Sequence, residues 1–408
     1  MKLTDVELKY KLQQMELRAL LEITEAINAN HTEEEIFRIF YFTLRGSFDM
    51  QKFALFTVDA EQDWQCHIKH GIETELDDFP EEIRNIEGIR STEGLTNSYI
   101  TQFEWVYPVR HENKVLAYML LTTNFAETET PARLQDRLDF IQALTNIVIV
   151  AIENRKLVRR RIQEEAIQRE LDMARGVQQL LLPTSLPQNQ KLQVAATYYP
   201  HHQVGGDYYD FYQLGESTFL LCIADVSGKG MPAAILMSNF QAALRMLVRQ
   251  GVSLEVMVDE LNGQIFASSK GDNYITAFIC LYNHNKKKLT YVNCGHIPPL
   301  LVHNAGNCQH LNRGTTMLGA FRKLPFVNIG EVESLEQFTL FSFTDGLSET
   351  FNPADEEFGV ERIEDIVCRN GQQKLEILHD KLMEELDTHR EDLPYADDIT
   401  MLSCRFAG

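Results

Sequence analysis

The sequence has few cysteines, no long apolar run and little positive charge. Its seven cysteines are scattered, odd in number and form no CxxC pair. This argues against a zinc site or a disulfide framework and favours a reducing, cytoplasmic location. No apolar run reaches membrane-spanning length and the first 30 residues are charged throughout, so we expect neither a signal peptide nor a membrane partner. The net charge of −21 also argues against nucleic acid and anionic membranes as partners.

The remaining composition is that of a folded protein. The chain has 408 residues, of which 44% are hydrophobic, which is ordinary for globular proteins. This length accommodates two domains and a helical connector. We expect a domain over residues 1–152, a connector over 153–182 and a second domain over 183–408.

The first domain combines helices with an antiparallel sheet. Apolar residues recur at helical spacing up to residue 27, and Thr32 with Glu35 forms a capping box that begins a second helix. Strand-like runs and a later helix follow, at residues 53–58, 64–68, 103–109, 115–122 and from 131 onward, with a turn at 111–114. This order is typical of an α+β sensor domain. It resembles a GAF domain, most closely over residues 107–121, and a PAS-like sensor is the alternative.

The connector is predicted to be one helix, continuous with the end of the first domain. It is rich in Arg and Glu, contains no proline and ends before Pro183. Its apolar residues follow helical spacing in part, but Arg160, Glu164 and Gln178 fall on the same seam. We expect a parallel two-stranded coiled coil, and therefore a parallel homodimer. The alternative is a solvated helix that packs on its own domain.

The second domain has the pattern of a two-sheet sandwich. Strands are predicted at residues 194–199, 208–214, 219–224, 274–282, 288–294, 338–343 and 399–406, and helices at 233–248, 254–268, 360–369 and 374–386. Helices that occur in pairs between runs of strands favour two stacked sheets with helices on their outer faces.

Aspartates lie at the ends of several of these strands. They are Asp207, Asp225, Asp345, Asp397 and Asp398. Oxygen ligands without cysteine or clustered histidine select hard cations, Mg²⁺ or Mn²⁺. Carboxylates that share a small volume repel one another, and two divalent ions offset that repulsion. Such a pair of ions can activate water and hold phosphoryl oxygens, which predicts hydrolysis of a phosphate ester.

Five motifs then occur in a characteristic order: Gly205-Gly206-Asp207-Tyr208-Tyr209-Asp210-Phe211, Ala224-Asp225-Val226-Ser227-Gly228-Lys229-Gly230, Asn293-Cys294-Gly295-His296, Phe343-Thr344-Asp345-Gly346 and Ala396-Asp397-Asp398-Ile399-Thr400. This order resembles SpoIIE/RsbU-type phosphatases, a bacterial branch of the PPM serine/threonine phosphatases. The resemblance implies an αββα sandwich and two metal ions. It implies these ligands: Asp207, Asp225, the Val226 carbonyl, Asp345 and one of Asp397 and Asp398, with Asp397 preferred. Asp207, Asp225, Asp345 and Asp397 would be the catalytic residues.

The resemblance also implies a function. It is the removal of phosphate from phosphoserine or phosphothreonine in a protein, under control of the sensor domain, and the substrate class is a STAS-domain antagonist of an anti-sigma factor. Two features of the wider PPM family are missing, namely a candidate acid histidine and a phosphate-binding arginine. Lys229 could reach a phosphate, and His296 is expected to brace a turn. The alternative function is a non-catalytic scaffold that binds an anti-sigma factor or its antagonist.

Overall fold

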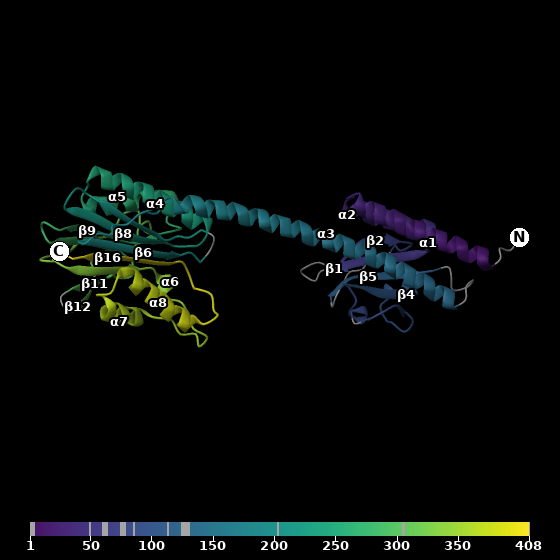
Figure 1. The fold of residues 1–408 in the computed structure, drawn as a ribbon. Coiled ribbons are helices and arrows are strands. Elements are labelled where there is room, and N and C mark those ends of the chain that lie inside the picture. Colours follow the sequence, from purple (N-terminus) through teal and green to yellow (C-terminus); the bar gives the residue numbers. More distant parts are fainter. Residues whose placement is uncertain are drawn as a thin grey trace. The chain divides into compact units, whose positions relative to one another are not determined.

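The computed structural model describes residues 5–48, 50–58, 64–73, 79–84, 86–111, 114–123, 131–201, 204–303 and 307–407. The chain forms two compact units, Met1–Glu165 and Ala166–Gly408, which we call unit 1 and unit 2. Each unit has its own sheets and core (Figure 1). The centre of the turn expected at 111–114 lies outside the described residues.

Unit 1 contains a five-stranded antiparallel sheet in the order β2-β1-β5-β4-β3. Its elements are α1 (Asp5–Asn28), α2 (Glu33–Ser47), β1 (Lys52–Val58), β2 (Trp64–His70), η1 (Glu81–Ile83), β3 (Arg90–Ser91), η2 (Ile100–Gln102), β4 (Trp105–His111), β5 (Lys114–Thr122) and the first part of α3 (Pro131–Gln179). The expected capping box begins α2, since Glu35 N donates to Thr32 Oγ1 and Thr32 N donates to Glu35 Oε2.

Both faces of the sheet in unit 1 are buried. Successive residues of a strand point to opposite faces, so Phe53 of β1 packs with the helices while Phe56 packs in a second, aromatic cluster. On this second face Trp64 and Phe79 stack with their ring centroids 3.8 Å apart. The helices thus cover one face, and the segments between β2 and β4 cover the other.

Helix α3 is a single helix of 49 residues. In unit 1, Arg155 donates to the carbonyl oxygens of Ile27 and His31, and Lys156 pairs with Glu33 at 2.8 Å. From residue 157 to 170 every side chain is exposed, including several apolar ones: Leu157, Val158, Ile162 and Ile167. Continuity of the connector is therefore confirmed, whereas no described contact shows what covers its apolar residues.

Unit 2 has four layers. Its elements are β6 (Leu192–Tyr199), β7 (Tyr208–Gln213), β8 (Thr218–Val226), α4 (Met231–Gln250), α5 (Leu254–Ser269), β9 (Ile275–Asn283), β10 (Lys288–Cys294), β11 (Leu300–His303), β12 (Asn307–His310), β13 (Gly314–Thr315), β14 (Gly330–Val332), β15 (Phe338–Phe343), α6 (Asp345–Ser348), α7 (Val360–Asn370), α8 (Leu375–Arg390) and β16 (Ile399–Phe406). One sheet has the order β13-β10-β9-β8-β7 with β14 on β10, and the other has the order β12-β11-β15-β16-β6.

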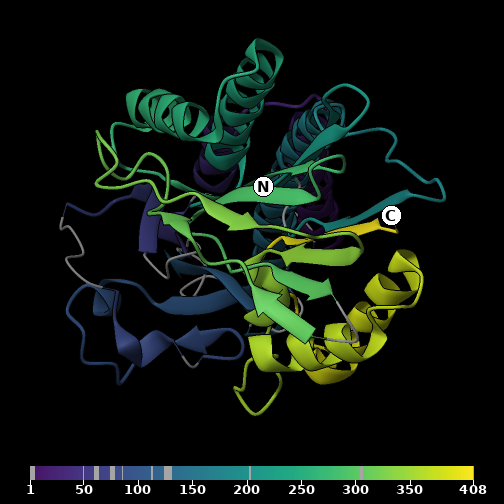
Figure 2. The ribbon, with the colours of Figure 1, turned by 90° about the vertical axis from the view of Figure 1, so that its left-hand side faces the viewer.

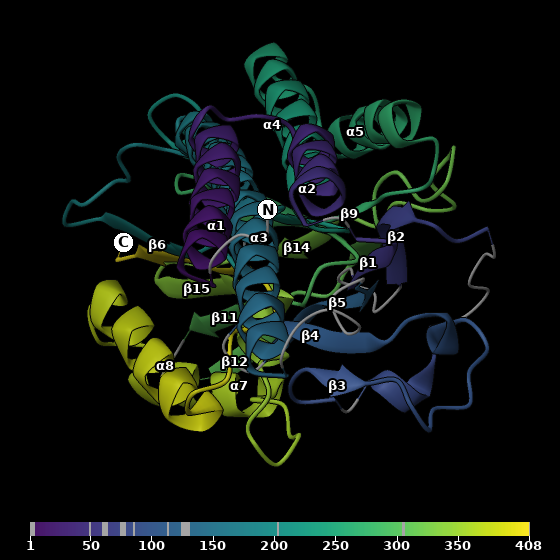
Figure 3. The same cartoon turned by 90° about the vertical axis from the view of Figure 1, so that its right-hand side faces the viewer.

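Three apolar clusters fill the spaces between these layers. The first joins α4 and α5 to the β8 sheet, the second joins the two sheets, and the third joins the β15 sheet to α7 and α8. Figures 2 and 3 show α4 and α5 on one side of the strands and α7 and α8 on the other. The two-sheet sandwich expected for this half of the chain is therefore present.

Helix α4 is the one described helix whose length and composition would allow it to cross a membrane. One face of α4 lies in the core, where Met237, Phe240 and Leu244 are fully buried, whereas Ile235 and Met246 are exposed. The packing of α4 on the sheet therefore accounts for the apolar residues of its buried face.

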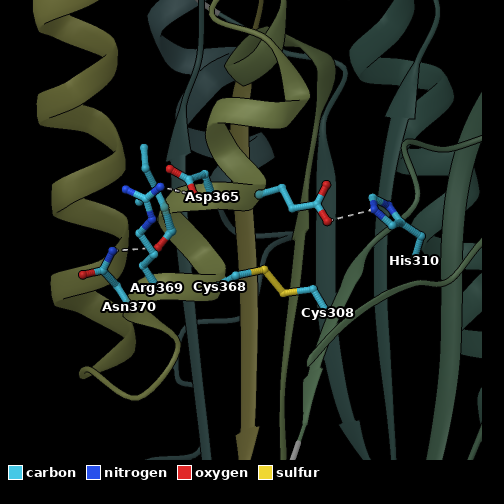
Figure 4. Close-up of a disulfide and its surroundings, with 8 residues drawn as sticks. Cys308, His310, Asp365, Cys368, Arg369 and Asn370 are labelled. Carbon is cyan, nitrogen blue, oxygen red and sulfur yellow. Dashed lines mark hydrogen bonds and ion pairs between the residues drawn. A yellow bond between two sulfur atoms is a disulfide. The ribbon is translucent and has the colours of Figure 1, made fainter. Parts of the chain in front are cut away.

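A disulfide joins Cys308 on β12 to Cys368 on α7 (Figure 4). For these two residues the disulfide corrects the expectation that the scattered cysteines argue against disulfide bonding. They lie 60 residues apart in the sequence, and only the packing of α7 on the second sheet brings their Cα atoms to 6.4 Å. The other cysteines are free: Cys66 is exposed, and the remaining four are buried.

Breaking this disulfide should destabilise unit 2. A cross-link that closes a loop of this length removes conformational entropy from the unfolded chain, worth up to about 4 kcal/mol. We expect Cys308→Ser with Cys368→Ser to lower the free energy of unfolding by a large part of that amount in urea titrations, and reductant to do the same to the wild type. Cys66→Ser is the matched control. Equal stability with and without reductant would contradict this expectation.

Candidate metal centre

Strand register brings the expected ligands to one edge of the sandwich. In the first sheet β7 begins where its antiparallel neighbour β8 ends, so Asp207 and Asp225 lie at the same end. In the second sheet β15 ends where β16 begins, so Asp345 lies at the same end as Asp397 and Asp398. Hydrogen bonds between the two sheets hold these strand ends together.

Asp207 is the most enclosed of these carboxylates. It is 2% exposed, and its Oδ2 accepts hydrogen bonds from Thr344 Oγ1 at 2.8 Å and Thr400 Oγ1 at 2.5 Å. Thr400 lies in β16 and Thr344 directly follows β15, so Asp207 joins the two sheets at this edge. Burial raises the pKa of Asp207 well above its ordinary value, and the charges of Asp225 and Asp398 add to that rise.

Asp225 and Asp345 also resist ionisation. Burial raises the pKa of Asp225 to about 7, with further contributions from Asp345 and Asp397. Burial likewise raises the pKa of Asp345, and Asp397 adds to this effect while the Gly346 N–H and Lys229 oppose it. The sequence analysis expects carboxylates at neighbouring strand ends to repel one another. The contributions of neighbouring aspartates to these raised pKa values are an effect of that kind.

The two adjacent aspartates have different surroundings. Asp398 is buried and accepts from two backbone groups, His201 N at 2.7 Å and Gly206 N at 2.8 Å, one on each carboxylate oxygen. Asp397 is 38% exposed; one oxygen accepts from Asp398 N and the other pairs with Lys229 at 2.8 Å. Asp398 therefore holds the loop before Asp207, and Asp397 has the more accessible oxygen.

Two glycines allow this close packing. A Cβ on Gly206 would lie 2.9 Å from the Val226 carbonyl oxygen, and a Cβ on Gly205 would lie 2.2 Å from Asp398 Oδ2. Contacts this short do not occur for real Cβ atoms. The Gly205-Gly206 pair therefore lets the backbone beside Val226 and Asp398 approach without a side chain between them.

The donor set fits hard divalent cations, although its members are not yet in a ligand arrangement. No group of three or more His, Cys, Asp or Glu side chains in the described ranges stands ready to hold a metal ion. The donors are all oxygens and share one edge, which is the chemistry that Mg²⁺ or Mn²⁺ requires. Burial, with neighbouring carboxylates, raises the pKa of Asp207, Asp225 and Asp345 at this edge.

Neighbouring motif residues brace the site. His296 donates its backbone N–H to Asn293 Oδ1 at 2.8 Å, and its Nδ1 lies 3.1 Å from Thr276 Oγ1. Burial lowers the pKa of His296 to about 4, so the ring is neutral near pH 7. Asp210 accepts from the Tyr208 and Tyr212 hydroxyls and pairs with Arg245 of α4 at 3.2 Å. Asp210 therefore ties β7 to α4.

Sequence reasoning missed three supporting side chains. Thr344 and Thr400 hold Asp207, and they occur inside motifs that were quoted only for their aspartates. Gln178 of α3 donates to Gly205 O at 2.6 Å and accepts from Gly205 N at 3.2 Å. Its assignment to an exposed coiled-coil seam was wrong, because the end of α3 packs on the loop that precedes Asp207 and leaves Gln178 only 7% exposed.

Comparisons with known proteins agree with this geometry. Residues 215–407 match the family model described as Stage II sporulation protein E (SpoIIE). Phosphoserine phosphatase RsbU of Bacillus subtilis (strain 168) is 32% identical over 251 residues, which are 60% of this chain and 72% of RsbU. Phosphoserine phosphatase RsbP of the same organism is 28% identical over 184 residues, 44% of this chain and 45% of RsbP.

A solved structure supports the fold. The SiaA-PP2C domain of Pseudomonas aeruginosa matches with a TM-score of 0.53 and 22% identity, over 60% of this chain and 98% of that domain. At this level of identity the match concerns the fold alone.

The metal-free chain should lose stability as the pH rises. The folded pKa of Asp225, about 7, exceeds its ordinary value of 3.8, so its contribution to stability is lost progressively between about pH 4 and pH 7. In chelator, Asp225→Asn should therefore raise the melting temperature by roughly 5 °C more at pH 8 than at pH 5. Asp259→Asn, on the exposed face of α5, is the control. A rise in melting temperature that is the same at pH 5 and pH 8 would contradict the raised pKa of Asp225.

Proposed function

The chain belongs to the SpoIIE/RsbU-type family of PPM phosphatases, and on this premise we propose that it removes phosphate from phosphoserine or phosphothreonine in a protein substrate. The observation that carries the proposal is the meeting of Asp207, Asp225 and Asp345 at one edge of two sheets, where burial and neighbouring carboxylates raise the pKa of each. Two relatives named phosphoserine phosphatases support the reaction class.

Two Mn²⁺ or Mg²⁺ ions would be held by this edge. The proposed ligands are Asp207, Asp225, the Val226 carbonyl, Asp345 and Asp397. When bound, the ions supply charge neutralisation and Lewis acidity for attack of water on a phosphate ester. Asp397 is preferred to Asp398 because both Asp398 oxygens already accept backbone N–H groups.

The chain's own residues prepare this chemistry. Thr344 and Thr400 orient Asp207 through a shared oxygen, Oδ2, and neither hydroxyl uses the other oxygen. Asp398 fixes the backbone of Gly206 directly before Asp207. These contacts come from residues at the ends of β15 and β16, so they set the position of Asp207 and of the loop before it.

The substrate class we propose is a phosphorylated STAS-type antagonist of an anti-sigma factor. It rests on the resemblance of the five motifs to SpoIIE/RsbU-type phosphatases. The net charge of −21 makes a protein a better partner than a nucleic acid. A non-catalytic scaffold would keep the same fold without turnover, and the metal experiment below separates the two.

We further propose that unit 1 is a GAF-like sensor that regulates unit 2 through α3. Its sheet order β2-β1-β5-β4-β3 with helices on one face supports this assignment. Helix α3 begins in unit 1 and ends in unit 2 with Gln178 bonded to Gly205, two residues before Asp207. The exposed apolar residues between 157 and 170 would pair with a second copy in a parallel homodimer.

Activity should require the divalent cation and the aspartates. Purified protein should hydrolyse a phosphopeptide with Mn²⁺ or Mg²⁺ and stop in chelator, because all proposed ligands are hard oxygens. Asp225→Asn or Asp345→Asn should lower kcat by several orders of magnitude with an unchanged circular dichroism spectrum. Asp259→Asn is again the control. Full turnover in chelator or in either site variant would refute the metal mechanism, and no turnover in the wild type with metal would favour the scaffold.

Activity should also depend on the geometry of α3. Inserting four residues after Gln168 rotates the two halves of the helix by about 40° relative to each other, whereas seven residues restore the phase to within about 20°. The first insertion should change kcat more than the second. Arg160→Leu with Glu164→Leu should tighten the dimer, measured by analytical ultracentrifugation. A monomer at micromolar concentration whose variants all turn over like the wild type would show that α3 is only a tether.

A further inference from the structure

Lys229 lies in the loop that follows β8, four residues after Asp225. Two glycines in the left-handed region flank it, Gly228 with φ 92° and Gly230 with φ 73°. Ser227 anchors the loop to the next strand, since its N–H donates to Tyr274 O at 2.9 Å and its Oγ accepts from Tyr274 N at 2.8 Å. These two hydrogen bonds hold the start of the loop beside β9, while the side chain of Lys229 remains 46% exposed.

The ammonium group occupies one oxygen of Asp397. Lys229 Nζ lies 2.8 Å from Asp397 Oδ2 and donates to Ala396 O at 3.0 Å. The other oxygen of Asp397 accepts from Asp398 N at 2.8 Å. Lys229 thus holds the Asp397 oxygen that the proposed metal would need, and its charge also reaches Asp345, whose pKa it lowers.

We propose that Lys229 is a phosphate-binding residue that Asp397 holds until a divalent cation takes this carboxylate. The inference rests on the proposed function. An ammonium and a divalent cation compete for the same oxygen, and the cation carries twice the charge. The released side chain is long, flexible and already half exposed, so it remains at the open side of the aspartate edge.

A free ammonium at that position suits an incoming phosphate. Lysine binds phosphate as a point charge, and the stretch from residue 199 to 214 around Asp207 contains no arginine that could do so. The lysine would then have two opposite effects. It weakens metal binding by competing for Asp397, and it strengthens phosphate binding once the metal has released it.

Because Lys229 is expected to weaken metal binding and to strengthen phosphate binding, one variant can test both effects. In the full chain, Lys229→Gln should bind Mn²⁺ about three- to tenfold more tightly in calorimetry, because one competing charge is gone. With Mn²⁺ saturating, the same variant should bind inorganic phosphate about tenfold more weakly, and Lys229→Arg should retain most of the phosphate affinity. Lys287→Gln is the matched control, since Lys287 pairs with Glu336 at the β9–β10 turn.

Unchanged Mn²⁺ and phosphate affinities in Lys229→Gln would overturn the proposal. A loss of both affinities would also overturn it, because that result indicates a structural role for the lysine. The proposed function fails by a different result. A wild-type chain that binds Mn²⁺ and phosphate and hydrolyses no phosphoester would end the phosphatase proposal and leave the lysine result standing.

Discussion

The structure of unit 2 depends on keeping several negative charges close together at a buried edge. Asp207 and Asp225 are drawn out of water, and burial makes both harder to ionise, with further contributions from Asp225 to Asp207 and from Asp345 to Asp225. Such an arrangement is unfavourable by itself. It persists because the edge belongs to two sheets that are stabilised elsewhere, by apolar clusters between all four layers.

Hydrogen bonds between the two sheets set the positions of the residues at this edge. Thr344 follows β15 and Thr400 lies in β16, yet both donate to Asp207 at the start of β7. Asp398 reaches in the opposite direction, to the backbone of Gly206. The loop before Asp207 is further held by Gln178 of α3. One loop thus joins both sheets and the end of the long helix.

Much of this could be predicted from the sequence, because it depends on local patterns. The capping box at Thr32, the long strands of unit 2 and the unbroken helix α3 all follow from periodicity, caps and the positions of proline. The short strands β11 to β14 were missed, since two to four residues carry no readable alternation. The aspartates were found as a group because each follows or precedes a long strand.

The sequence by itself determined the types of donor atom, the strands that carry them and their family resemblance. Tertiary structure decided which partner each group meets. Asp397 and Asp398 are adjacent and chemically identical, but one pairs with Lys229 and the other with two backbone N–H groups. Gln178 became a buried contact of Gly205 and Cys308 found Cys368 for the same reason. Contacts between distant parts of a chain depend on strand register and layer packing, and neither can be read from the spacing of residues along it.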